Sequence, residues 1–223
     1  MKVIIMTSNI NGIASRVIPT LSKNKRLKIT RVVLVECKYK ISRTTIKRKL
    51  KKIYKIGIIG ALNGIKMRKW YYDIDALNIN KICNSFNIEL IKTPIINCNR
   101  TNDIFRESKA ELGLSLGNSY IPKSIFSIPR YGMLNVHTEI LPDFQGAQSV
   151  IWPIHEGKYE TGFTIHQIDN KIDKGDILYI EKFPIHFYPR LQDTVKINLA
   201  KSRLKIPKAL EYVCENYLSL KNN

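Results

Sequence analysis

The sequence predicts an open α/β fold, with a mostly parallel β-sheet and helices on both of its faces. Short runs rich in Val, Ile and Leu recur along the chain, and turn residues bound them. Segments with helical spacing of apolar residues separate these runs as far as residue 137. This alternation is typical of sheets whose parallel strands are joined by helical crossovers.

The first five strands follow from the apolar runs at residues 2–6, 29–37, 88–94, 111–118 and 132–137. Between them we expect helices at 10–23, 74–87 and 121–129, and one or two exposed helices within the basic segment 39–73. A helix at 101–109 should begin at Thr101 or Asn102, because both are good N-cap residues. Pro19 is unfavourable near the middle of the first helix.

The pattern after residue 137 predicts a helix at 147–157, which Gly157 should close. Residues 161–169 and 179–187 should form two further strands, the second at an edge because it contains Pro184. Residues 193–220 should form a helix, or a helix pair broken around Pro207. We expect one α/β domain over residues 1–180, with a basic insertion at about 38–72, and a strand and helix extension over 181–223.

The composition argues against several classes of protein. The four cysteines form no C-x-x-C motif, so we expect reduced thiols rather than a disulfide framework or a metal site. The apolar run at the N-terminus is too short for a signal-peptide core or a membrane span. A cytoplasmic protein with no membrane partner is therefore expected.

The positive charge is concentrated in the first third of the chain. The net charge is +19, and residues 1–70 contain 19 Lys and Arg but a single acid, Glu36. Residues 71–223 contain 18 Lys and Arg and 17 Asp and Glu. Such asymmetry suits a phosphate-bearing ligand, a membrane surface or a nucleic acid. A chain-wide bias toward Lys, Ile and Asn, with a solvated basic face, would give the same pattern.

Three polar residues could carry chemistry together. Asn135 and His137 stand two residues apart at the end of a predicted strand, so their side chains should point the same way. Asp173 follows in a turn. A histidine near a carboxylate can transfer protons, and an asparagine amide can donate to an oxyanion. The set suits attack of an amine on an acyl carbon. The alternative is structural: a hydrogen-bonded core histidine, an asparagine that satisfies a loop, and a plain turn.

Residues 134–178 resemble the core of the formyltetrahydrofolate-dependent formyltransferases. That family includes methionyl-tRNA, glycinamide-ribonucleotide and nucleotide-sugar N-formyltransferases. The matching residues occur in the family's order and spacing, and they are Asn135, His137, Leu141, Pro142, Gly146, Thr161, Gly162, His166 to Asp169, and Asp173 to Gly175. Residues 115–132 resemble the family's folate-side strand and loop, and the rest of the chain matches only in the order of its elements.

The resemblance implies a Rossmann-like formyltransferase fold, with residues 1–180 as the catalytic domain, and 10-formyltetrahydrofolate as the formyl donor. Asn135 would stabilise the oxyanion, His137 would assist charge stabilisation and proton transfer, and Asp173 would relay the amine proton through water. Backbone groups of two segments would hold the pteridine of the donor. The residues concerned are Leu116, Gly117, Asn118, Tyr120, Ile121 and Pro122, and Gln167, Ile168 and Asp169.

The acceptor amine is less constrained by the resemblance. The family often has serine at the position of Glu139 and arginine at that of Gln145, and both positions, with Gly146, should face the acceptor. About 45 residues follow Leu178, fewer than the C-terminal β-barrel of methionyl-tRNA enzymes needs, which argues against tRNA. The loop with Asn9, Asn11 and Gly12 is only a weak match to the phosphate loop of glycinamide-ribonucleotide enzymes.

We therefore expect a nucleotide-linked amino sugar as the acceptor, as in glycan biosynthesis. Arg68, Lys69 and Trp70 would bind its phosphates and base. The alternative for this segment is an amphipathic helix that packs its aromatic residues on the sheet. Glycinamide ribonucleotide is the alternative acceptor, and a homodimer is possible. A hypothesis from another class is a non-catalytic basic module that binds nucleic acid, in which Asn135, His137 and Asp173 would have no reason to converge.

Overall fold

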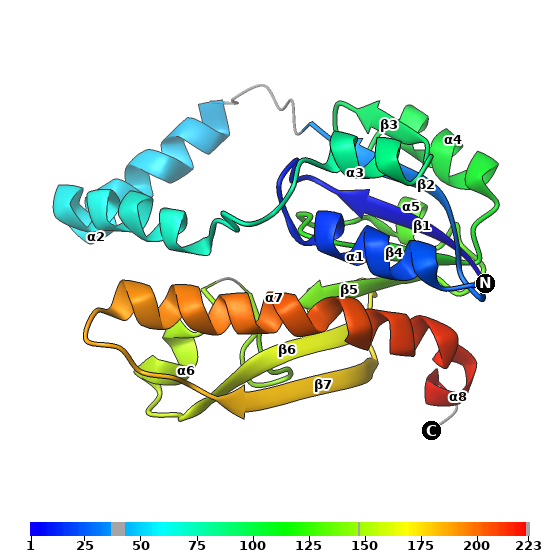
Figure 1. Ribbon diagram of the computed structural model, residues 1–223. Helices are drawn as coiled ribbons and strands as arrows, with labels where there is room; N and C mark the ends of the chain where they lie inside the picture. The colour runs from blue at the N-terminus through cyan, green and yellow to red at the C-terminus, as the bar shows by residue number, and fades with distance from the viewer. Residues whose placement is uncertain (37–42, 147, 222–223) are drawn as a thin grey trace.

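A seven-stranded sheet crosses the molecule in the order β3-β2-β1-β4-β5-β6-β7 (Figure 1). The structure is a computed structural model, and it describes residues 1–36, 43–146 and 148–221. Five strands run parallel: β1 (Lys2–Thr7), β2 (Lys28–Val35), β3 (Leu90–Thr93), β4 (Leu112–Ser115) and β5 (Met133–His137). The antiparallel strands β6 (Glu160–Gln167) and β7 (Ile177–Pro184) complete the sheet. The predicted open, mostly parallel α/β fold is confirmed, with β7 at an edge.

Helices cover both faces of this sheet. One core contains residues of α1 (Ile13–Lys23), α3 (Ile79–Ser85) and α7 (Leu191–Glu215), and the other contains residues of α4 (Asn99–Ser108) and α5 (Lys123–Phe126). Along β1, Val3 and Ile5 belong to the first core, and Ile4 and Met6 to the second. Both faces of β1 are therefore buried, which explains why its sequence is a continuous apolar run.

The sheet register aligns the carboxyl ends of its central strands. Met6 of β1 pairs with Ser115 of β4, and Ser115 pairs in turn with Asn135 of β5. Across the antiparallel junction, Asn135 pairs with His166 of β6. Polar side chains from three neighbouring strands thus meet where β4 and β5 have their carboxyl ends. In open α/β folds, ligands bind outside the carboxyl ends of the strands.

One expected helix start was wrong, and the structure decides between the two alternatives for the C-terminal helix. The helix α4 begins at Asn99 with Cys98 as its N-cap, because the Thr101 hydroxyl donates to the Ile95 carbonyl instead of capping. The helix α7 continues through Pro207 as one helix, and the break comes later, before α8 (Tyr217–Lys221). Burial of Ile206 and Leu210 on both sides of the proline offsets the missing hydrogen bond.

The basic segment forms a helix that stands away from the sheet (Figure 1). It is α2 (Arg43–Arg68), with a kink at Gly57, where φ is +71°. The short 3-10 helix η1 (Lys69–Tyr71) follows and returns the chain to the body of the molecule. The expectation of one or two exposed helices here is confirmed. In the described ranges, no helix is both long and apolar enough to cross a bilayer.

Candidate active site

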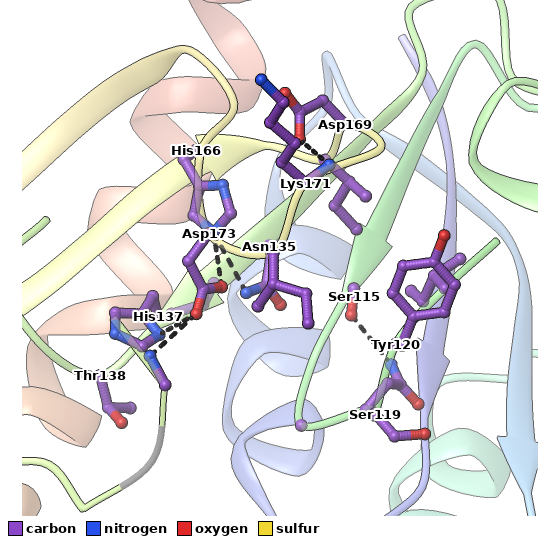
Figure 2. Close-up of a pocket in the computed structure, with 17 residues that line it drawn as sticks. Ser115, Ser119, Tyr120, Asn135, His137, Thr138, His166, Asp169, Lys171 and Asp173 are labelled. Carbon is purple, nitrogen blue, oxygen red and sulfur yellow. Dashed lines mark hydrogen bonds and ion pairs between the residues drawn. The ribbon is translucent and has the colours of Figure 1, made fainter. Parts of the chain in front are cut away.

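A pocket of about 360 Å³ lies at the carboxyl ends of β4 and β5 (Figure 2). Its lining combines three segments: the loop after β4, the end of β5 with the loop that follows, and the loop between β6 and β7. The lining residues are Ser115, Gly117 to Ile121, Asn135 to Thr138, Gly146, His166, Ile168, Asp169, and Lys171 to Asp173. The structure therefore brings Asn135, His137 and Asp173 to one pocket, from positions far apart in the sequence.

The amide of Asn135 is held by the neighbouring strand. Its Nδ2 lies 3.2 Å from Nε2 of His166, the residue opposite it in the register of β5 and β6. The other ring nitrogen, Nδ1, lies 2.9 Å from the Gln167 carbonyl oxygen, which can only accept. Nδ1 therefore carries a proton and donates it. In the neutral ring Nε2 must then accept from the Asn135 amide. Burial lowers the pKa of His166 and so favours this neutral form.

The geometry around His137 leaves one ring nitrogen for chemistry. Its Nε2 lies 2.7 Å from the Phe144 carbonyl oxygen and must donate to it. Its Nδ1 lies 3.8 Å from Oδ2 of Asp173. Nδ1 can thus accept a proton inside the pocket, and Asp173 would stabilise the resulting imidazolium.

Asp173 is placed between two histidines (Figure 2). Its Oδ1 lies 3.7 Å from Nε2 of His166, and its Oδ2 accepts from the Gly146 amide at 3.1 Å. The backbone of Asp173 is left-handed, with φ at +52°, a conformation that Asp tolerates better than most residues. The next glycine, Gly175, lies so close to the Gln167 carbonyl that an added Cβ would be 1.9 Å from that oxygen. A tight turn therefore fixes the position of the carboxylate.

The residues expected at the donor divide into two groups. Gly117, Asn118, Tyr120, Ile121, Ile168 and Asp169 line the pocket. The remaining three serve the scaffold around it. Leu116 is buried in the core, Pro122 is the N-cap of α5, and Gln167 uses its side chain to bond the Tyr131 carbonyl and the Tyr217 hydroxyl.

The loop after β1 lies beside the pocket without lining it. The Asn9 amide donates to the Gly117 carbonyl, and the Ser8 hydroxyl donates to Asn118. Asn11 forms an isolated bridge with Asn78, and Gly12 is the N-cap of α1. Of these expected acceptor residues, Asn9 comes nearest to the pocket because it contacts the pocket's own loop.

Glu139 does not face the pocket, contrary to expectation. Its side chain is 2% exposed, and its Oε1 accepts from the Thr161 hydroxyl at 2.5 Å. The Val150 amide donates to its other oxygen at 3.3 Å. Burial raises the pKa of Glu139 to about 7. The residue therefore joins the end of β5 to the start of β6, and its carboxylate does not line the pocket.

The aromatic part of the basic segment is also placed differently from the expectation. Trp70 and Tyr71 pack against a small cluster formed by Val150, Val195 and Leu199. The aromatic residues are thus used at least in part for packing, as in the structural alternative, and Trp70 stays partly exposed. Arg68, Lys69 and Gln145 are exposed but do not line the pocket, whereas Gly146 does.

Several pocket residues were not among the expected site residues. Ser115, Ser119, Val136, Thr138, Lys171 and Ile172 belong to this group, together with His166. His166 could have been predicted as a site residue, because it lies in the stretch 166–169 that resembles the formyltransferase pattern. The rest are placed by the loops, whose paths the sequence pattern does not determine.

Part of the chain is similar in sequence to formyltransferases. The Formyl transferase family model matches residues 107–202. Methionyl-tRNA formyltransferase of Hydrogenovibrio crunogenus is 46% identical over 65 residues, which are 29% of this chain and 21% of the relative. The enzyme of that name from a Wolbachia strain of Drosophila simulans is 33% identical over 108 residues, which are 48% and 36%. The matches thus span a fifth to about a third of these curated relatives.

Solved structures are similar in fold over nearly the whole chain. Glycinamide ribonucleotide transformylase 1 from Symbiobacterium toebii superposes with a TM-score of 0.66 at 12% identity, and the match covers 97% of this chain and 88% of that one. The sugar 3N-formyl transferase WlaRD, solved in the presence of dTDP and 5-N-formyl-THF, gives a TM-score of 0.56 at 19% identity. That match covers 100% of this chain and 64% of the other. Residues 107–202, which contribute all of the pocket lining, therefore match the Formyl transferase family in sequence, within a chain that has the fold of formyltransferases.

Proposed function

We propose that this protein transfers the formyl group of 10-formyltetrahydrofolate to a primary amine. The observation that carries the proposal is the arrangement of hydrogen bonds around Asn135 and His137. Both side chains are held from behind, the first by His166 and the second by the Phe144 carbonyl. Each therefore presents a defined group to the pocket: an amide N–H of Asn135, and the unprotonated Nδ1 of His137.

In the proposed reaction the amine attacks the formyl carbon, and the bond between that carbon and N10 of the donor breaks. The Asn135 amide donates to the oxyanion that develops on the formyl oxygen. His137 Nδ1 takes the proton that the amine loses, and Asp173 stabilises the charged ring. The same proton ends on N10 of tetrahydrofolate, so the protein returns to its starting state.

The donor fits the side of the pocket formed by the loops after β4 and β6. Ile121 and Ile168 offer apolar surface, and Tyr120 lies with them along the lining. The glycine at 117, with φ at +77°, lets the backbone turn close to a ligand. A flat, partly polar ring system suits such a slot of apolar side chains and backbone groups.

We propose a nucleotide-linked amino sugar as the acceptor. The Glu139 carboxylate is buried against Thr161, so it adds no exposed negative charge beside a phosphate-bearing amine. Lys171, exposed at the pocket, supplies a cation. The structure of WlaRD was solved with a nucleoside diphosphate, which makes this acceptor class the first to test.

Glycinamide ribonucleotide shares the phosphate and the primary amine, and is the second candidate. The experiment is to incubate the purified protein with 10-formyltetrahydrofolate and, in parallel, an amino-sugar nucleotide panel, glycinamide ribonucleotide and methionyl-tRNA. Mass spectrometry then identifies which amine has gained one formyl group. A formylated amino-sugar nucleotide supports the proposed acceptor. If only another amine is formylated, the proposal of formyl transfer stands and the proposed acceptor is wrong.

A further inference from the structure

The helix α2 carries an unusual amount of exposed apolar surface. Between residues 46 and 65, nine large apolar side chains are at least 40% exposed. They are Ile46, Leu50, Ile53, Tyr54, Ile56, Ile58, Ile59, Leu62 and Ile65. Tyr54 reaches 92%, Ile59 77% and Ile58 73%. Apolar residues that gather in this way mark a binding surface, whereas single exposed ones are normal.

These apolar residues form one stripe before the kink at Gly57 and another after it. Ile46, Leu50 and Tyr54 follow one another at intervals of four, and Ile58, Leu62 and Ile65 repeat at four and three after Gly57. Residues at these intervals share one face of a helix. Each half of α2 thus has an apolar face of its own.

The basic residues of the segment 43–69 lie at its two ends, at 43–55 and 66–69, and residues 56–65 contain none. Residues 43–69 contain ten Lys and Arg and no Asp or Glu. Lys47, Lys51 and Lys55 form a row parallel to the apolar stripe of the first half, and all three are exposed. A basic face beside an apolar face is typical of helices that lie in the interface of an anionic membrane.

The base of α2 is firmly attached to the body of the molecule. Arg16 of α1 forms two hydrogen bonds of 2.8 Å with Asp73, just after η1. The Tyr71 hydroxyl donates to the Ser149 carbonyl, and Arg203 of α7 donates to the Tyr71 carbonyl. The chain thus has a fixed base at 70–73, from which α2 stands away from the sheet (Figure 1). The apolar side chains of α2 are exposed to solvent.

We propose that α2 binds the surface of an anionic lipid bilayer, with its apolar stripe among the acyl chains and its lysines at the headgroups. Pairing of α2 with α2 of a second copy is disfavoured, because two segments without acids would repel each other. Nucleic acid would satisfy the charge but offers little for eight aliphatic side chains to contact. The expectation of no membrane partner rested on the lack of a spanning segment, which binding at the surface does not need.

The test is co-sedimentation of the full chain with vesicles at physiological salt. We expect binding to vesicles of phosphatidylcholine mixed with phosphatidylglycerol, and none to phosphatidylcholine alone. Replacing Lys47, Lys51 and Lys55 with Gln should weaken partitioning by on the order of 100-fold, at roughly fivefold for each lysine. Ile58→Glu combined with Leu62→Glu should abolish it. Circular dichroism and the thermal midpoint check that each variant is folded.

Matched control variants separate α2 from the rest of the surface. Leu204 and Leu218 are also exposed, on α7 and α8, and Leu204→Glu with Leu218→Glu should leave vesicle binding unchanged. Equal binding by the variants in α2 and by these controls overturns the proposal. So does binding to a transfer RNA mixture without binding to anionic vesicles, which would assign α2 to nucleic acid. So does self-association that Ile58→Glu abolishes while vesicles remain unbound.

Discussion

Asn135 and His166 form a cross-strand pair in which the ring fixes the direction of the amide. Nδ2 of Asn135 lies 3.2 Å from Nε2 of His166, while Nδ1 of the same ring donates to the Gln167 carbonyl. Only the tautomer with an unprotonated Nε2 satisfies both contacts. His166 is therefore a positioning residue, which aims the remaining N–H of Asn135 into the pocket.

Substituting His166 should separate this positioning role from simple packing. His166→Leu removes the acceptor, and we expect about a tenfold lower turnover, the effect of losing one orienting hydrogen bond. His166→Gln keeps an oxygen that can accept from Asn135 and should retain most of the activity. The pH profile is the second readout, since the Gln variant cannot be protonated on acidification. Equal losses in the Leu and Gln variants, with the same pH profile, would show that the ring has only a structural role.

His137 should be the most sensitive position for proton transfer. His137→Ala should lower turnover by a factor on the order of 100 or more, because Nδ1 is the pocket's base in the proposed reaction. The thermal midpoint of the variant shows whether the fold is kept. Unchanged turnover in a folded His137→Ala protein would refute the role of this residue.

Glu139 should make stability depend on pH. Burial raises its pKa from 4.5 to about 7, so the folded protein keeps a proton that the unfolded chain releases near pH 4.5. The contribution of Glu139 to the stability of the fold is therefore most favourable below pH 4.5, and it declines as the pH rises to about 7. The decline is on the order of 3 kcal/mol. Glu139→Gln should remove it, and urea denaturation across this pH range measures the difference. An identical pH dependence in both proteins would contradict the buried carboxyl.

Gly175 should tolerate no side chain. A Cβ there would lie 1.9 Å from the Gln167 carbonyl oxygen, so Gly175→Ala should cost about 3 kcal/mol of stability and displace the turn that holds Asp173. Gly64→Ala is the matched control, because nothing lies within 4 Å of the added Cβ in the exposed helix α2. It should be neutral or stabilise by up to about 1 kcal/mol. Similar midpoints for the two variants would argue against the tight turn.

Much of the fold could be predicted from local patterns. The apolar run at the start of the chain defines β1 because both faces of that strand are buried, and Gly157 ends the segment after α6 (Ile151–His155) in a left-handed conformation. The error at Thr101 and the two alternatives left open at Pro207 have a common cause. Tertiary contacts decide whether a hydroxyl caps a helix and whether a helix continues through a proline, and local propensity does not include them.

The pocket could be predicted only in part. The spacing of Asn135 and His137 on one strand was sufficient to place them together, and a motif supplied Asp173. Glu139 was misplaced because its expected direction came from a family position that often holds serine. The sequence does not say that Thr161 and the Val150 amide would receive its carboxylate. For Trp70 the sequence left two alternatives open, because a basic aromatic stretch has the same composition whether it binds a nucleotide or packs on α7.

The most direct test of the account is a formyl-transfer assay with the wild-type protein and His137→Ala in parallel. Each is incubated with 10-formyltetrahydrofolate and the amine panel, and mass spectrometry follows the formylated amine and the tetrahydrofolate released. We predict equal amounts of both products from the wild type, and a rate lower by a factor on the order of 100 or more from His137→Ala. No formylated amine from the folded wild-type protein, or equal rates from the two proteins, would contradict the account.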